Sequence, residues 1–217
     1  MTRNLPPSAS VATPLEDAKL HAPSAARNAD AIAAVLQDHA PSCGNALEIA
    51  SGTGQHVITF AAALPDLNWQ PTDIDPLRLR SIDSYVRSSG LQNVKPACLL
   101  DAASDGWAAA YAGQDLIVLI NLLHLIPARH ARTILNQAAQ ALAPAGTLLV
   151  YGPFAHDGVL KSAADQRFDA ELRSADADIG YKDTRDMQRW FADAGLTAAP
   201  QEMPANNLAF VARKSAL

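Results

Sequence analysis

Cysteine, surplus positive charge and long apolar runs are all scarce in this chain of 217 residues, and each scarcity excludes a class of protein. The two cysteines, Cys43 and Cys98, form no Cys-x-x-Cys pair and are too few for a disulfide framework, so we expect both to be reduced. The formal net charge of −5 and the lack of any Lys/Arg-rich run argue against a nucleic-acid partner. No apolar stretch reaches the ~18 residues of a membrane span, and the chain opens without an apolar signal segment. We therefore expect a cytoplasmic protein without a membrane partner.

The composition suits one globular domain. Hydrophobic residues make up 49% of the chain, which is enough for one sizeable core. Residues 1–21 mix prolines, serines and small residues without a clear period, so we expect a tail or an arm lying over the body. Residues 22–217 are predicted to form a single domain.

Strand-like apolar runs alternate with helical periodicities through most of that domain. We predict helices over residues 24–39, 55–64, 76–89, 128–142, 162–173 and 184–194. We predict strands over residues 46–50, 69–73, 94–100, 116–120 and 147–151, followed by a terminal antiparallel hairpin of residues 197–203 and 208–211. Continuous apolar strands are typical of a parallel sheet with helices on both faces. The predicted fold is a doubly wound, Rossmann-like α/β sheet of about seven strands.

The most informative stretch is residues 46–56, where a short apolar strand runs into Glu48, a turn of small residues and a helix. Gly52 and Gly54 match the first two glycines of the dinucleotide fingerprint, but the third position is Val57, which weakens an NAD interpretation. A P-loop is also disfavoured, because no Lys-Ser/Thr follows Gly54. The turn therefore predicts a nucleotide-sized site of another kind.

The turn resembles the first motif of class I S-adenosylmethionine (SAM) dependent methyltransferases, with Ala50 where the first glycine usually lies. Alanine is acceptable there if its φ stays negative. Asp73 ends the second predicted strand, where the family places the acid that holds both ribose hydroxyls, and a carboxylate offers two acceptor oxygens to such a diol. Alternatively, Asp73 caps the helix predicted to begin at Pro76.

The resemblance implies further cofactor contacts at the following strand ends. Asp101 would accept from the adenine amino group beside a backbone contact at Ala102, and Asn121 would lie near the sulfonium. Arg27 would pair with the methionyl carboxylate. The full set implied for SAM, which would leave as S-adenosylhomocysteine, is Arg27, Asn28, Glu48, Ala50, Ser51, Gly52, Gly54, Asp73, Ile74, Asp101, Ala102 and Asn121.

A narrower resemblance runs from about residue 23 to residue 213. The chain is similar to a group known as DUF938, or methyltransferase-like protein 26. This similarity rests on residues 24–28, 48–56, 69–73, 151–154 and 203–208. It indicates the cofactor better than the methyl acceptor.

Few residues are candidates for the acceptor side. His124 lies just past the fourth predicted strand, where small-molecule methyltransferases often carry a histidine. It is our first candidate to receive a proton from the acceptor. Alternatively, it is a packed residue at the start of a helix. His56 and Tyr151 are further catalytic candidates, with structural roles as their alternatives. The substrate candidates are Leu122, Phe154 and Asn207. His21, His39, His130 and His156 are expected at the surface, and their spacing suggests no metal site.

The residues after the fourth predicted strand narrow the range of possible methyl acceptors. Amide and adenine N-methyltransferases carry Asn/Asp-Pro-Pro-Tyr there, whereas this chain has Asn-Leu-Leu-His, and no carboxylate cluster supports metal-assisted chemistry. General bases are scarce, and a thiol needs the least help from one because its thiolate is accessible near neutral pH. We therefore expect methylation of a small thiol, with a hydroxyl next. The alternatives are an intramolecular displacement that releases methylthioadenosine, and a non-catalytic SAM-binding module.

Overall fold

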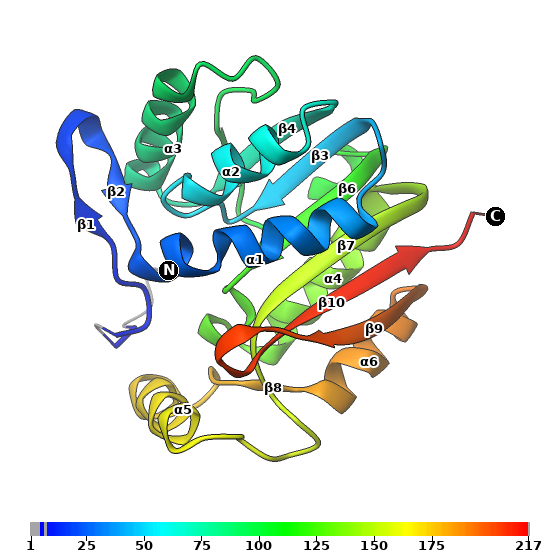
Figure 1. The fold of residues 1–217 in the computed structure, drawn as a ribbon. Helices are drawn as coiled ribbons and strands as arrows, with labels where there is room; N and C mark the ends of the chain where they lie inside the picture. The colour runs from blue at the N-terminus through cyan, green and yellow to red at the C-terminus, as the bar shows by residue number, and fades with distance from the viewer. Residues whose placement is uncertain (1–4, 7, 217) are drawn as a thin grey trace.

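A computed structural model of the chain describes residues 5–6 and 8–216. Residues 1–4 and 7 of the predicted arm, and the last residue of the predicted domain, lie outside this description. The core of the molecule is one twisted sheet with helices on both faces (Figure 1). Its strand order is β5-β4-β3-β6-β7-β10-β9, and the short β8 pairs with β7 beside this path. The doubly wound α/β prediction is confirmed.

The first five strands of the path are parallel, the sixth runs against them, and the seventh, which is antiparallel to the sixth, runs in the same direction as the first five. The parallel strands are β5 (Cys98–Leu99), β4 (Leu67–Asp73), β3 (Gly44–Ile49), β6 (Gln114–Ile120) and β7 (Leu142–Ala155). β10 (Asn207–Lys214) lies antiparallel between β7 and β9 (Leu196–Glu202), and β8 (Lys182–Asp183) pairs with the end of β7. The predicted terminal hairpin is therefore present, with β10 inserted next to the parallel strands.

Six helices accompany the sheet in the described chain. α1 (Pro23–His39), α2 (Gln55–Ala63) and α3 (Pro76–Ser89) cover one face, and α4 (Ala128–Ala141) and α6 (Thr184–Asp193) cover the other (Figure 1). α5 (Ala163–Ala175) lies past the carboxyl end of β7. None of the helices in the described part of the chain has the length and apolarity that a bilayer crossing requires.

The sheet edge at β5 is shorter than the predicted strand 94–100. Only Cys98–Leu99 pairs regularly with β4, while Val94 forms an isolated bridge to Trp69. Pro96 lies between these two contacts and has no backbone N–H to donate to a ladder, so it interrupts the strand. The carboxyl end of β5 still lies beside the carboxyl end of β4, which is what positions the following loop at the site.

The N-terminal segment packs along α3 and continues across the molecule. β1 (Thr13–Pro14) and β2 (Leu20–His21) form a small antiparallel hairpin beside α3 (Figure 1). The Leu20 backbone N–H donates to Ser81 Oγ at 2.8 Å, and Ser84 Oγ donates to the Asp17 carbonyl. These bonds fix the hairpin to α3, so the arm has a defined place on the body.

Candidate functional site

A large cavity opens at the carboxyl ends of the parallel strands. Its volume is about 2040 Å³, whereas a pocket for one drug-sized ligand measures roughly 300–1,000 Å³. The lining comes from the turns after β3, β4, β5 and β6, the start of α1, the end of β7, and α5. This is the edge at which open α/β sheets bind their ligands, and the cavity has room for two molecules side by side.

The turn between β3 and α2 is held in left-handed backbone conformations. Ala50, Gly52 and Gly54 have φ values of 53°, 63° and 93°. The expectation that Ala50 keeps a negative φ is therefore wrong: the strand must turn sharply at this residue, and an L-residue there costs roughly 1–2 kcal/mol. The turn is braced by a 2.8 Å bond from the Ser51 N–H to the Thr72 carbonyl on β4.

Two residues of the implied cofactor set support the turn instead of facing the cavity. A Cβ on Gly54 would lie 2.7 Å from the Ile82 Cα, so this glycine lets the turn pack against α3. Glu48 is 1% exposed on β3 and its Oε2 has no hydrogen-bond partner in the described structure. Burial raises the Glu48 pKa to about 8, partly offset by a hydrogen bond from Ser51. Neither residue lines the cavity.

Asp73 joins the end of β4 to the glycine turn. Its Oδ2 accepts from the Gly52 N–H at 2.9 Å, and its Oδ1 accepts from the Asp75 N–H at 3.0 Å. The cap of α3 is Asp75, which accepts from the Leu77 N–H at 2.8 Å, so the capping alternative for Asp73 is wrong. Burial raises the pKa of Asp73, opposed by the two backbone bonds and by nearby Arg78. The carboxylate lines the cavity.

The ends of the neighbouring strands reach the same cavity. Ile74 is 57% exposed at the rim, and Asp101 is exposed beside the buried Ala102, whose carbonyl accepts from Trp107 Nε1 at 3.0 Å. Asn121 has a φ of 53° after β6, and its N–H donates to the Tyr151 carbonyl at 2.8 Å. The residues that follow β3, β4, β5 and β6 therefore line one cavity, as the sequence predicted for the ends of these strands.

One wall of the cavity is polar and comes from α1, α2 and β7. His56 Nε2 lies 2.8 Å from Asn28 Oδ1, and Tyr151 lines the cavity together with these two residues. Burial lowers the pKa of His56 to about 4, so its ring is neutral near pH 7. The side chain of Arg27, one residue earlier on α1, is exposed and lines the same opening.

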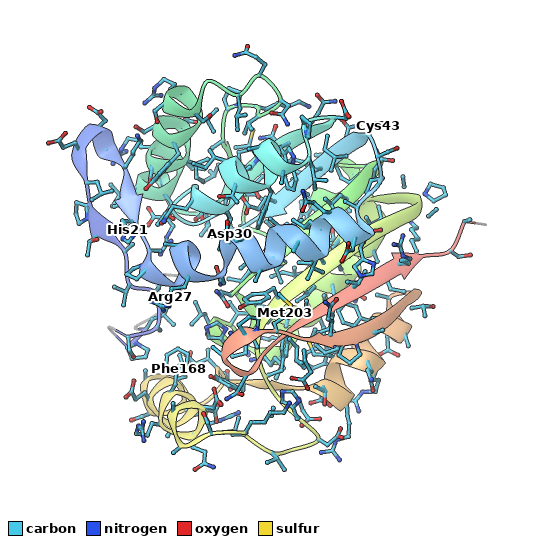
Figure 2. The ribbon with its side chains drawn as sticks, viewed as in Figure 1. His21, Arg27, Asp30, Cys43, Phe168 and Met203 are labelled. Carbon is cyan, nitrogen blue, oxygen red and sulfur yellow. The ribbon has the colours of Figure 1, made fainter. Side chains whose placement is uncertain are left out.

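The opposite wall is aromatic. His124, Phe168 of α5 and Tyr181 stand edge to face, with ring centroids 5.7, 6.3 and 6.2 Å apart. Burial and then the charge of Lys182 lower the pKa of His124 to about 3. Figure 2 shows Arg27 on α1 and Phe168 on α5 on facing sides of the space between the two helices. His124 is thus a neutral, packed imidazole.

Phe154 does not belong to the site. It is 3% exposed and packs edge to face with Phe210 at 5.0 Å, in the core beneath α6. The prediction that it contacts substrate is wrong, because alternation along β7 directs it away from the face that carries Tyr151. Leu122 and Asn207 do line the cavity, as does Tyr151. His156 is less open than expected, with 18% of its side chain exposed.

Sequence reasoning missed the contribution of the N-terminal segment and of α5. Ser8 Oγ donates to Glu171 Oε2 on α5 at 2.8 Å, and Arg78 Nη2 on α3 donates to Ser10 Oγ at 2.6 Å. Residues 8–11 therefore line the cavity between its two sides. Phe168 and Tyr181 were also missed, because Phe168 is a single aromatic in the polar helix α5 and gives no periodic signal, and Tyr181 lies in the connection just before β8.

The fold is similar to those of several solved methyltransferases. The structure is similar to an O-methyltransferase family protein from Burkholderia thailandensis (TM-score 0.75, 18% identity, covering 88% of this chain and 57% of that one). It is similar to mitomycin 7-O-methyltransferase (TM-score 0.75, 17% identity, 88% and 54%). It is also similar to human N-acetylserotonin methyltransferase, solved in complex with SAM (TM-score 0.72, 16% identity, 88% and 53%). The chain spans a little over half the length of these proteins.

The chain belongs to the family described as "Protein of unknown function (DUF938)", which it matches over residues 19–214. The narrower similarity to methyltransferase-like protein 26 stays a prediction.

Proposed function

We propose that this protein is a SAM-dependent methyltransferase for a small-molecule acceptor, with a thiol favoured and a hydroxyl next. The observation that carries the proposal is the Asp73 carboxylate, held beside the Gly52 turn at the floor of the cavity. A carboxylate in this place suits a ribose diol, and the exposed Ile74 and Asp101 beside it suit an adenine ring and its amino group. Similarity of the fold to an enzyme solved with SAM supports the same assignment.

The residues present fit the cofactor. Asp73 would hold the ribose, Ile74, Asp101 and Ala102 the adenine, and Ser51, Asn121 and Arg27 the methionyl part. When bound, SAM supplies a methyl group on a sulfonium that is open to in-line displacement, which leaves S-adenosylhomocysteine. The chain's own task is then to align the acceptor, because in-line transfer depends on orientation.

The wall chemistry supports an acceptor that ionises without a base. His124 and His56 are both buried, with pKa values lowered to about 3 and about 4, so each is a weak proton acceptor. Asp165 on α5 already accepts from Ser162, Tyr181 and Asn206. A thiol has a pKa of ~8.5, so an appreciable fraction is thiolate near neutral pH, whereas an alcohol needs a base.

The test is a binding and turnover series with the full-length protein. Calorimetry should show that SAM binds, and a panel of thiols, phenols, alcohols, carboxylates and amines should then be assayed with SAM. We expect thiols to be methylated fastest and S-adenosylhomocysteine to form in equal amount. Release of methylthioadenosine would indicate intramolecular displacement, and SAM binding without turnover of any acceptor would indicate a binding module. Either result would overturn the proposal. Inert thiols beside active phenols would overturn its preference for a thiol acceptor.

A further inference from the structure

The N-terminal arm crosses the mouth of the cavity and joins α3 to α5. Arg78 Nη2 on α3 donates to Ser10 Oγ at 2.6 Å, and Ser8 Oγ donates to Glu171 Oε2 on α5 at 2.8 Å. Because extended backbone advances roughly 3.3 Å per residue, the two serines lie no more than about 7 Å apart and bridge the space between the helices. Ala9, between them, is half-buried and lines the cavity. The arm is therefore part of the cavity wall.

Apolar side chains from the arm and from the body meet at the α5 end of the cavity. Leu5 and Ala9 of the arm pack against the hydrophobic cluster that contains Tyr181, and Leu125 and Phe168 pack against the same cluster. The Ala9 N–H donates at 2.9 Å to the carbonyl three residues earlier, which holds this part of the arm in a compact bend. These residues also line the cavity, and together they form what we call the apolar pocket: Leu5, Ala9, Leu125, Phe168 and Tyr181.

The apolar pocket lies away from the proposed ribose site. In the pairing of β4, β3, β6 and β7, Asp73 is level with Tyr151. Three strand spacings of ~4.8 Å separate these two residues, so they lie about 14 Å apart across the sheet. The helix that carries Phe168 follows β7 and lies past its carboxyl end. With SAM seated over Asp73, the apolar pocket is on the acceptor side of the cavity.

Two charged side chains that line this end of the cavity already have partners. The Asp165 carboxylate accepts from the Tyr181 hydroxyl and from Asn206 Nδ2, each at 3.1 Å. The Arg129 guanidinium pairs with the Asp178 carboxylate at 3.1 Å. The contacts that remain for the body of an acceptor are therefore mainly apolar.

We propose that the apolar pocket holds the body of the methyl acceptor, with Leu5 and Ala9 of the arm as its outer wall. The pocket then selects acceptors whose nucleophilic atom is carried on an apolar body, such as an alkane thiol. The inference rests on the proposed function and deepens it, because it names the class of acceptor and the segment that selects it. Apolar surface that leaves water on binding supplies the preference, and it grows with each methylene of the acceptor.

Binding of a methylated product tests this wall without any turnover. Hexyl methyl sulfide is titrated into the full-length protein with S-adenosylhomocysteine present, and carbon-13 NMR follows the alanine methyl groups. The Ala9 signal is assigned by its loss in Ala9→Ser, and Ala170, which is exposed on α5 outside the cavity lining, is the reference. We expect the Ala9 signal to shift and the Ala170 signal to stay in place. Failure of the sulfide to bind, or binding that leaves the Ala9 signal unmoved, would overturn the inference.

Kinetics with a series of thiols test whether the wall selects the acceptor. We expect kcat/KM of the wild type to rise about fourfold for each methylene from ethanethiol to hexane-1-thiol until the pocket is full. Ala9→Leu adds three carbons inside the pocket, so it should lower the ratio of kcat/KM for hexane-1-thiol to that for ethanethiol about tenfold or more. Ala170→Leu adds the same three carbons outside the cavity and should leave this ratio within about twofold. Kd for SAM should stay within about twofold in both variants.

The outcomes separate this inference from the function on which it rests. An unchanged ratio in Ala9→Leu would overturn the inference while methyl transfer stands, and a weaker Kd for SAM beside it would place the arm over the cofactor. A wild-type protein that binds hexyl methyl sulfide at Ala9 but methylates no thiol would overturn the thiol acceptor of the proposed function and leave the apolar pocket in place.

Discussion

The Asp73 carboxylate accepts a 2.9 Å hydrogen bond from the Gly52 backbone N–H, and this bond ties the end of β4 to the turn that follows β3. The second carboxylate oxygen is also held, by the Asp75 N–H at 3.0 Å. The carboxylate is therefore fixed in orientation before any ligand arrives, at the point where two neighbouring strands open into the cavity. A group held in this way recognises a ligand without a further ordering cost.

Asp73→Asn should weaken SAM binding strongly. The amide keeps the size of the side chain but loses the charge and one acceptor oxygen, and loss of a hydrogen bond to a charged group costs about 1.5–3 kcal/mol. We expect Kd for SAM, measured by calorimetry, to rise about 10- to 100-fold. Asp66→Asn, an exposed aspartate at the other end of β4, should leave Kd unchanged. An unaltered Kd in Asp73→Asn would mean that this carboxylate only braces the turn.

The helices and strand ends could be predicted from the sequence because their signals are local. Pro76 and Gly90 mark the two ends of α3, and the structure places them as the first helical residue and the left-handed C-cap, while the N-cap is Asp75 and not the Asp73 considered from the sequence. The apolar run at β6 indicated a buried parallel strand, as found. Residues at the ends of such strands meet at one edge for topological reasons, so Asp73, Asp101 and Asn121 could be grouped without knowing any distance.

Gly54→Ala should destabilise the fold more than Gly90→Ala. Both glycines have a positive φ, 93° and 70°, but a Cβ on Gly54 meets the Ile82 Cα at 2.7 Å, whereas a Cβ on Gly90 meets nothing within 4 Å. Gly90→Ala should cost about 1–2 kcal/mol for its backbone conformation. Gly54→Ala should cost about 1–3 kcal/mol more for the steric conflict. Urea unfolding measures both, and equal losses would show that α3 shifts freely away from the turn.

Ala50→Gly should stabilise the protein. The φ of 53° costs an alanine roughly 1–2 kcal/mol, while glycine loses about 0.5–1 kcal/mol in chain entropy, so a net gain of up to about 1.5 kcal/mol is expected. Ala145→Gly is the matched control, because Ala145 has a φ of 62° far from the cavity. Both variants should raise the free energy of unfolding, measured in urea, and neither should weaken SAM binding. A loss of stability in Ala50→Gly alone would mean that the alanine methyl packs favourably in the turn.

The parts of the site that escaped prediction depend on contacts between distant segments. Ser8 bonds to Glu171 and Ser10 bonds to Arg78 only because the N-terminal arm crosses the cavity that the rest of the fold forms. The sequence around Phe168 shows a polar helix, and nothing local reveals that α5 turns this one ring toward His124. The positive φ of Ala50 likewise follows from the sharp turn imposed by the packed sheet, against the preference of alanine itself.

Glu48→Gln should remove a loss of stability that develops as pH rises from 4.5 to about 8. The folded-state pKa of Glu48 is raised from 4.5 to about 8 by burial, so the folded state holds a proton that the unfolded state has lost between these values. Its contribution is complete below pH 4.5 and is lost as pH rises through about 8, at up to about 1.4 kcal/mol per pH unit. His56 and His124 have lowered pKa values and act in the opposite sense, since they destabilise the fold as pH falls below 6.5. Both histidines are common to the two proteins, so their effects cancel in the difference. Urea unfolding across this range should show that the free energy of unfolding of Glu48→Gln increases relative to that of the wild type as pH rises. A constant difference between the two proteins would contradict a protonated Glu48 in the folded state.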